Sequence, residues 1–198
     1  MSRMTAPAEG DIPAASRPAL DAAAHQLGFV PNMYHALAAT PKALNAWLDL
    51  RKAMSTSLDA ATRQGIAHAV DEINGCDYCD AMHTWVSQQL TRLDDDEIAR
   101  NRGGSSNNTR RAAALAFARE VALTRGKVSD CALDAVRVAG FTDGQILEIV
   151  AVVVLFTMSN YFNNVMKTDI DVFPNKGVWS SKVDDLCPTQ QCLPAIGQ

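Results

Sequence analysis

The stretch of residues 72–83 constrains the fold more than any other, because it combines a helix end, a helix start and three chemically active side chains. Gly75 predicts the end of one helix, since glycine adopts the left-handed C′ conformation without a steric penalty from a Cβ atom. The next helix is then expected to begin near Cys76. Its first turn carries Cys76 and Cys79, and its second turn carries His83.

This spacing places the three side chains along one helix face. Residues three or four apart on a helix have Cβ atoms roughly 5–6 Å apart. The reactive form of cysteine is the thiolate, which the N-terminus of a helix favours. A histidine one turn away can take the thiol proton or donate one to a leaving oxygen, and a second cysteine can resolve an oxidised first one. Cys76, Cys79 and His83 are therefore candidate catalytic residues of a redox site.

Two other interpretations of these residues remain open. A single CxxC is often half of a zinc site, but His83 is the one further ligand in register, and no second CxxC or HxxxH follows. The two cysteines could also be inert members of the hydrophobic core, because free cysteine buries readily. The alignment of Cys76, Cys79 and His83 at a helix start favours the redox interpretation, and we expect no bound metal or cofactor.

The sequence around this motif resembles a known family. The run 63–79, followed by His83, is similar to the core of the alkylhydroperoxidase D-like members of the carboxymuconolactone decarboxylase family, and the similarity extends over about 27–164. The resemblance implies that Cys79 is the peroxidatic residue, Cys76 the resolving one and His83 the proton shuttle. The helix dipole alone would instead favour Cys76, which lies nearer to the helix start.

One position departs from the family pattern. Many hydroperoxidase members carry a glutamate twelve residues before the first motif cysteine, where it feeds a proton relay, but this chain has Gln64. An amide cannot accept and return a proton at ordinary pH. Gln64, His68 and Glu72 share one helix face, so one hypothesis is that His68, helped by Glu72, replaces the missing carboxylate. The alternative is that both are solvated surface groups and that the site relies on His83 alone.

The rest of the chain predicts an all-α helical bundle of the alkylhydroperoxidase D-like type, because every convincing segment has the helical period of about 3.6 and none alternates with period 2. Asp94 with Glu97, and Thr142 with Gln145, resemble capping boxes. Helices are expected from Ser16 to Gly28, after Pro31-Asn32, from Thr40 through Met54, from Asp59 to Gly75, from Cys76 through Leu90, near Ile98, from Thr109 to Arg125, from Ser129 to Gly140 and from Thr142 to about Met166.

A chain of 198 residues suits one domain with tails. Residues 1–15 are rich in proline, alanine and serine and are predicted to form a flexible N-terminal arm. The helical domain is expected over 16–173. Residues 174–198 form a C-terminal extension that the resemblance does not cover. Its Cys187 and Cys192 could form a disulfide, but two cysteines in such an extension are more often free thiols.

Charge and cysteine count narrow the possible partners and location. A net charge of −4 gives no electrostatic argument for binding nucleic acid or an anionic membrane. Five cysteines, Cys131 among them, do not suggest a secreted disulfide framework, and no signal peptide is evident, so a cytoplasmic protein is expected.

The apolar window 146–158 is too short to span a bilayer and contains Glu148, so we expect a buried helix. A helix that is apolar nearly all round needs burial on every side, which predicts a homo-oligomer. The resemblance implies an assembly built on trimers.

These observations favour a thiol-dependent hydroperoxidase. A thiolate attacks a hydroperoxide to give a sulfenic acid and an alcohol, a Cys76–Cys79 disulfide forms, and an external dithiol of thioredoxin or lipoyl type reduces it. Two alternatives are a lactone decarboxylase, as the family name suggests, and a redox-sensing or thiol–disulfide exchange module. The CxxC argues against the decarboxylase, whose chemistry needs a general acid/base and an anion-binding group, and the sequence separates the last alternative poorly.

Overall fold

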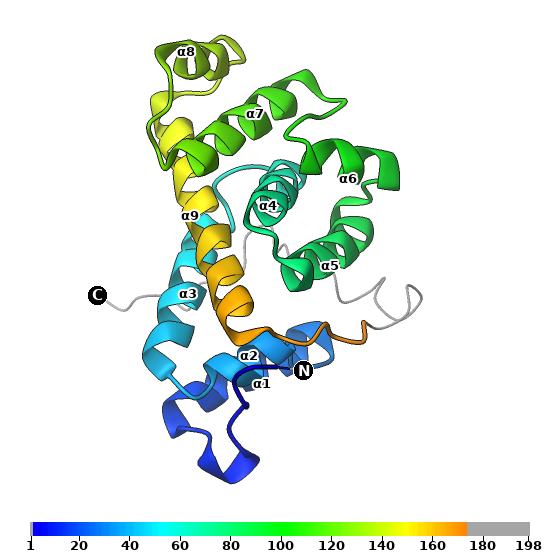
Figure 1. Cartoon of the computed structure of the whole chain (residues 1–198), viewed down its shortest axis with the longest axis vertical. Helices are drawn as coiled ribbons and strands as arrows, with labels where there is room; N and C mark the ends of the chain where they lie inside the picture. The colour runs from blue at the N-terminus through cyan, green and yellow to red at the C-terminus, as the bar shows by residue number, and fades with distance from the viewer. Residues whose placement is uncertain (1, 174–198) are drawn as a thin grey trace, which may run out of the picture.

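The computed structural model describes residues 2–173, and all regular secondary structure in this part of the chain is helical (Figure 1). The prediction of an all-α bundle is confirmed. Nine α-helices lie in this range: α1 (Arg17–Leu27), α2 (Asn32–Leu37), α3 (Pro41–Met54), α4 (Ala60–Asn74), α5 (Asp77–Val86), α6 (Asp95–Arg102), α7 (Thr109–Thr124), α8 (Asp130–Val138) and α9 (Asp143–Met166). Two 3₁₀ turns (Glu9–Asp11, Ala14–Ser16) and a π-helical turn (Ser87–Thr91) complete the set.

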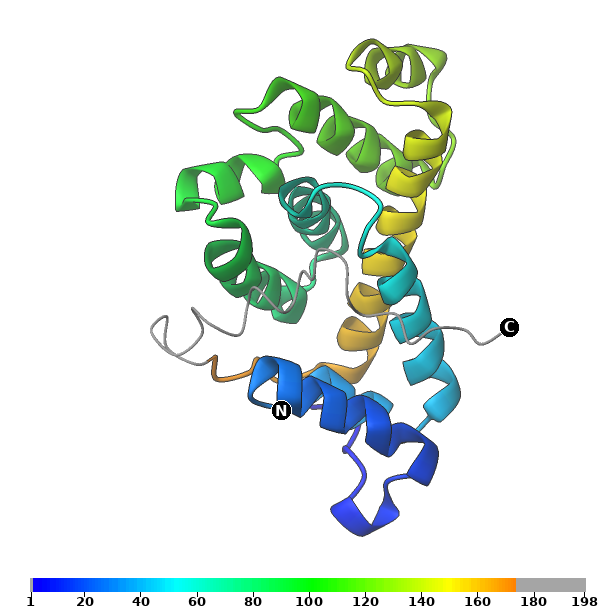
Figure 2. The same cartoon turned by 180° about the vertical axis from the view of Figure 1, so that it is seen from behind.

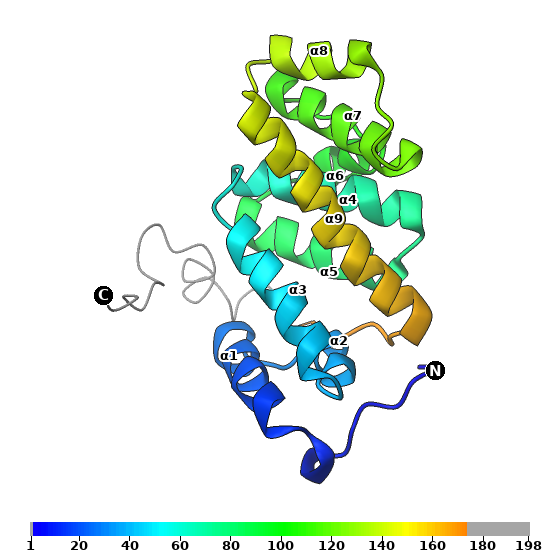
Figure 3. The same ribbon diagram turned by 90° about the vertical axis from the view of Figure 1, so that its left-hand side faces the viewer.

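Helix α4 lies at the centre of the bundle and packs against α5, α6, α7 and α9 (Figure 1). The long helix α9 runs obliquely across the molecule and also packs against α3 (Figure 3). Helices α1 and α2 lie at one end of the molecule and α8 at the other (Figures 1 and 2). The turn between α4 and α5 therefore sits beside α9, and this arrangement positions the candidate site.

Local sequence signals set most helix ends. Gly75 ends α4 in the left-handed conformation, with a φ of 59°, as the sequence predicts. Asp59 begins the same helix by accepting a hydrogen bond from the backbone N–H of Thr62 at 2.9 Å. Thr142 and Gln145 form the predicted reciprocal capping box at the start of α9.

Two details of the helix prediction are wrong. The motif helix is α-helical only to Val86 and continues as a π-helical turn rather than as an α-helix to Leu90. Asp94 caps α6, but Glu97 does not complete the capping box. The buried Glu97 carboxylate instead accepts hydrogen bonds from Ser106, Asn107 and Arg111. The ion pair with Arg111 of α7 compensates for the cost of burying the charge.

Helix α9 contributes to both large hydrophobic clusters and still exposes apolar side chains. Within residues 2–173 it is the one helix long and apolar enough to cross a membrane, yet its buried side chains, such as Ile149 and Leu155, belong to the core of the bundle. On its other face Leu147, Val154 and Tyr161 are exposed, with Leu147 at 70%. A single chain thus does not bury α9 on every side, and the predicted homo-oligomer would have to cover the remaining apolar face.

The predicted N-terminal arm contains the first 3₁₀ turn and the start of the second, and it contacts the end of α9. The backbone N–H of Arg3 donates to the carbonyl of Met166 at 2.7 Å, and Ser2 Oγ donates to Asp169 at 3.0 Å. Cys131 is a free, exposed thiol on α8. The predicted extension 174–198, with its two cysteines, lies outside the described residues.

Candidate active site

The two motif cysteines meet at the start of α5. Cys76 is the N-cap residue of the helix and Cys79 lies in its first turn, with their Cα atoms 5.3 Å apart and their sulfurs joined in a disulfide. The backbone N–H of Cys79 donates to Cys76 Sγ at 3.3 Å. Only 2% of Cys76 and 3% of Cys79 is exposed. The redox pair is therefore enclosed in the apolar cluster formed with α2, α3 and α9.

His83 is held by a carboxylate that sequence reasoning missed. Its Nδ1 lies 2.6 Å from Oδ2 of Asp71, a buried residue of α4. Asn160 of α9 donates from Nδ2 to Asp71 Oδ1 at 2.7 Å, and its own Oδ1 accepts from Asn74 at 2.8 Å. With its proton on Nδ1, the imidazole donates to Asp71 and leaves Nε2 as a proton acceptor. The ring also packs edge-on against Phe156, with centroids 4.9 Å apart.

A second missed residue touches the disulfide itself. Asn163 of α9 is buried, and its Nδ2 donates to Cys79 Sγ at 3.3 Å. The contact joins residues 84 positions apart in the chain. Such a pairing leaves no local signal in the sequence, unlike the three- and four-residue spacings of the motif.

His68 is fully buried, so the interpretation of this residue as a solvated surface group is wrong. Its Nε2 lies 3.0 Å from Ser87 Oγ and its Nδ1 lies 3.4 Å from Asp80 Oδ1, both on the segment that contains the motif helix. Burial lowers the pKa of His68, because the charged imidazolium is poorly solvated there. Glu72, by contrast, is exposed. Whether the two form a proton relay stays a prediction.

Asp80 links His68 to an arginine. Arg102 donates two hydrogen bonds to the Asp80 carboxylate, at 2.8 and 2.9 Å, and a third to Thr84 Oγ1 at 3.0 Å. Burial favours the neutral acid, but the hydrogen bonds from His68 and Arg102 outweigh it and hold the pKa of Asp80 well below its usual range. Asp80 therefore carries a charge at neutral pH and fixes α5 against α4 and α6.

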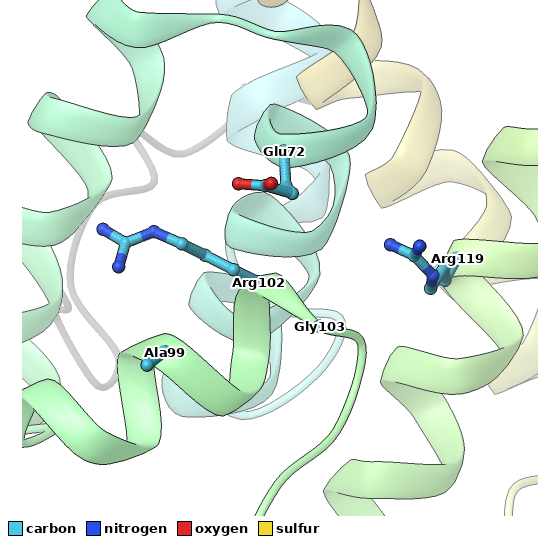
Figure 4. Close-up of a pocket in the computed structure, with 5 residues that line it drawn as sticks. All are labelled: Glu72, Ala99, Arg102, Gly103 and Arg119. Carbon is cyan, nitrogen blue, oxygen red and sulfur yellow. The ribbon is translucent and has the colours of Figure 1, made fainter.

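Glu72 and Arg102 also line a pocket of about 330 Å³ together with Ala99, Gly103 and Arg119 (Figure 4). The pocket lies among α4, α6 and α7, and the two guanidinium groups stand on either side of Glu72 in this view. Neither motif cysteine belongs to its lining. The Oε1 atom of Gln64, the residue at the family's glutamate position, is buried and has no hydrogen-bond partner among the described residues.

Tyr78, between the two cysteines, is a packed aromatic residue. Its hydroxyl donates to Asp171 Oδ2 at 2.6 Å and accepts from the backbone N–H of Met33 at 3.3 Å. Burial raises the pKa of both Tyr78 and Asp171. The contact ties the segment after α9 to the first turn of the motif helix. In residues 2–173 no group of three or more His, Cys, Asp or Glu side chains is placed to hold a metal ion.

The fold and the site together form a helical bundle with a CxxC pair at the start of one helix and a carboxylate-bound histidine one turn later. The model of the carboxymuconolactone decarboxylase family matches residues 41–120, which contain the motif and the helices around it. Over these residues the chain is similar to the carboxymuconolactone decarboxylase family, and its fold is similar to that of an alkylhydroperoxidase AhpD core. No curated protein sequence shows a significant match to it.

Solved structures of similar fold agree with this similarity. An uncharacterized peroxidase-related protein from Ralstonia eutropha JMP134, with an alkylhydroperoxidase AhpD core, is 26% identical with a TM-score of 0.74, covering 86% of this chain and 92% of its own. A peroxidase-related protein from Silicibacter sp. TM1040 is 22% identical with a TM-score of 0.75 and the same coverage. The debrominase Bmp8 is 21% identical with a TM-score of 0.71, covering 85% of this chain and 92% of its own. The last two similarities, under 25% identity, concern the fold alone.

Proposed function

We propose that this protein is a thiol-dependent hydroperoxidase that reduces organic hydroperoxides with electrons from an external dithiol. The observation that carries the proposal is the bonded Cys76–Cys79 pair at the start of a helix, within an apolar cluster and one turn before His83. Two cysteines placed close enough to form a disulfide can cycle between the dithiol and disulfide states. The apolar surroundings favour an organic substrate over a strongly hydrated one.

The reaction balances with residues of this chain and one dithiol. His83 Nε2 first takes the proton of the Cys79 thiol. The Cys79 thiolate then attacks the terminal oxygen of the hydroperoxide, the O–O bond breaks, and the alkoxide takes that proton from His83 and leaves as an alcohol. The Cys76 thiol attacks the sulfenic sulfur of Cys79, releasing water and forming the disulfide. An external dithiol reduces this disulfide by exchange and is itself oxidised to a disulfide.

The assignment of Cys79 as nucleophile follows the family resemblance, one contact and one spacing along the helix. Cys79 Sγ accepts a hydrogen bond from a side-chain amide, and His83 lies four residues further along the same helix. Cys76 Sγ accepts a backbone N–H and serves as the helix cap, which also stabilises an anion, so Cys76 is suited to the second attack.

The roles can be tested by supplying reduced protein with cumene hydroperoxide and dithiothreitol, and by counting thiols before and after peroxide. Cys79→Ser is expected to abolish turnover. Cys76→Ser is expected to react once and retain a sulfenic acid on Cys79, which dimedone labelling and peptide mass spectrometry would locate. Cys131→Ser, which removes the exposed thiol of α8, is the matched control and should match the wild type.

Other outcomes would favour the alternatives. Unchanged steady-state turnover in either motif variant would refute the two-thiol cycle, and a sulfenic acid on Cys76 would reverse the two roles. Slow reaction with peroxide combined with fast disulfide exchange would indicate a redox sensor. Decarboxylation of a lactone substrate that survives alkylation of both thiols would indicate the decarboxylase activity in the family's name.

The proposal also includes a cellular setting. We expect a cytoplasmic homo-oligomer, built on trimers as the family resemblance implies, that meets a thioredoxin- or lipoyl-type reductant. The hydroperoxide and the dithiol are its expected partners, and nucleic acid and membranes are not.

A further inference from the structure

Asn163 makes an unusual set of contacts beside the redox pair. It lies on α9 and is 2% exposed. Its Nδ2 donates to the Ser159 carbonyl at 3.0 Å, to Met33 Sδ at 3.0 Å and to Cys79 Sγ at 3.3 Å. Its Oδ1 is buried and has no hydrogen-bond partner in the described part of the chain. The Nδ2 group of the amide therefore has three acceptors within hydrogen-bond distance, while Oδ1 has no donor.

The fold fixes which end of the amide faces the sulfur. The Ser159 carbonyl belongs to the backbone of α9 and can only accept a hydrogen bond. If the amide were flipped, two oxygens would face each other at hydrogen-bond distance. The donor end of Asn163 thus stays next to Cys79, and Oδ1 stays unpaired.

Both ends of the amide match what the peroxide reaction needs. Reduction of the disulfide turns Cys79 Sγ into a thiolate, a much stronger acceptor than a disulfide sulfur or the thioether of Met33, so the N–H bond to it strengthens. At the other end, a buried polar atom without a partner is rare in native proteins, because its lost hydration is not compensated. A hydroperoxide carries one O–H group that can supply the missing donor.

We propose that Asn163 is a catalytic residue whose Nδ2 stabilises the Cys79 thiolate and whose Oδ1 accepts the O–H of the hydroperoxide. The inference rests on the proposed hydroperoxidase function. The terminal oxygen transferred to sulfur keeps its hydrogen, since a thiolate and HO–OR give a sulfenic acid and an alkoxide. Oδ1 therefore holds the same hydrogen in substrate and product, and it aims the terminal oxygen at Sγ.

The donor role is tested by the ionisation of Cys79. In a Cys76→Ser background, iodoacetamide labelling of Cys79 is followed against pH, with the labelled peptide identified by mass spectrometry. Asn163→Ala should raise the pH midpoint of labelling by about one to two units, because the thiolate loses a charge-assisted hydrogen bond. Asn164→Ala, at the next position, removes an exposed amide bonded to the Asn74 carbonyl and should leave the midpoint unchanged.

The acceptor role is tested at a pH above the labelling midpoints of both the Cys76→Ser parent and its Asn163 variants. The Cys79 thiol is then fully ionised in every protein compared. There Asn163→Ala should lower the rate with cumene hydroperoxide by about tenfold relative to its rate with iodoacetamide, which has no peroxide O–H to orient. Asn163→Ser, which is small and polar, is measured beside it so that the result does not depend on the folding of one variant. Circular dichroism confirms the fold of each.

The failures can be told apart. An unchanged labelling midpoint in both Asn163 variants overturns the donor role, and equal losses with peroxide and iodoacetamide overturn the acceptor role. If the wild type itself does not react with hydroperoxide, the proposed function and the acceptor role fall together, and the labelling midpoint still decides the donor role.

Discussion

Asp71 Oδ2 and His83 Nδ1 lie 2.6 Å apart in the interior, which ties the motif helix α5 to the central helix α4. Asn160 holds the second oxygen of Asp71, so the carboxylate has a partner on each side. This geometry sets the orientation and the tautomer of the imidazole, as second partners of functional histidines generally do.

The first prediction is that Asp71→Asn lowers peroxide turnover by about ten- to a hundredfold, the range typical of residues that orient a functional histidine. Asparagine offers one acceptor and one donor group where Asp71 accepts at both oxygens, so either His83 or Asn160 loses its partner. Thiol counts should stay as in the wild type. Asp77→Asn, which removes an exposed carboxylate at the start of α5, is the control. Wild-type turnover in Asp71→Asn would show that His83 needs no such support.

The second prediction follows from the relay hypothesis. If His68 and Glu72 replace the family's carboxylate, His68→Ala and Glu72→Gln should each lower turnover with the thiol count intact, and Gln64→Glu should restore part of the loss. Activity equal to that of the wild type in all three variants from about pH 6 to 8, which brackets the reference pKa of histidine, would remove the relay from this helix face. A loss with His68→Ala alone would instead point to its contacts with Asp80 and Ser87.

The third prediction concerns stability in acid. Burial lowers the pKa of His68 below its ordinary value of 6.5, so at lower pH the unfolded chain binds a proton that the folded chain does not. The free energy of unfolding should therefore decrease as the pH falls below 6.5, by up to about 1.4 kcal/mol per pH unit for this one group.

Urea unfolding between about pH 5 and 7.5, a window around the reference pKa of histidine, measures this effect. His68→Gln should flatten the decrease, since glutamine does not titrate. His25→Gln, at an exposed position of α1, should leave it as in the wild type. An equally steep decrease in His68→Gln would assign the acid sensitivity to other groups.

The fourth prediction is a homo-oligomer. Leu147, Val154 and Tyr161 are exposed on α9 at seven-residue intervals, a spacing that lines one helix face and suits packing against another helix. Light scattering should give a multiple of the chain mass of 21.3 kDa. Val154→Lys should lower that mass, and Glu148→Lys, elsewhere on the same helix, is its control. A mass near 21.3 kDa at every dilution would contradict the prediction.

The sequence by itself determined the helices, the break at Gly75 and the alignment of Cys76, Cys79 and His83. These features depend on interactions within a few residues: helical periodicity, the left-handed glycine at a helix end, and side chains three or four positions apart. These features can therefore be predicted from one sequence, without knowledge of the tertiary packing. The same reasoning located the capping box of α9 and the starts of most helices.

Only the tertiary structure decided which polar groups complete the site. Asn160 reaches Asp71 across 89 positions of the chain and Asn163 reaches Cys79 across 84, so no local spacing links them. Helix packing also buried His68, which its place in a polar stripe had suggested could be solvated, and it turned Glu97 from a helix cap into an ion pair with Arg111. The physical reason is common to all four: a buried polar group takes whichever partner the packed helices bring within hydrogen-bond distance, because leaving it unpaired costs more than any local preference supplies.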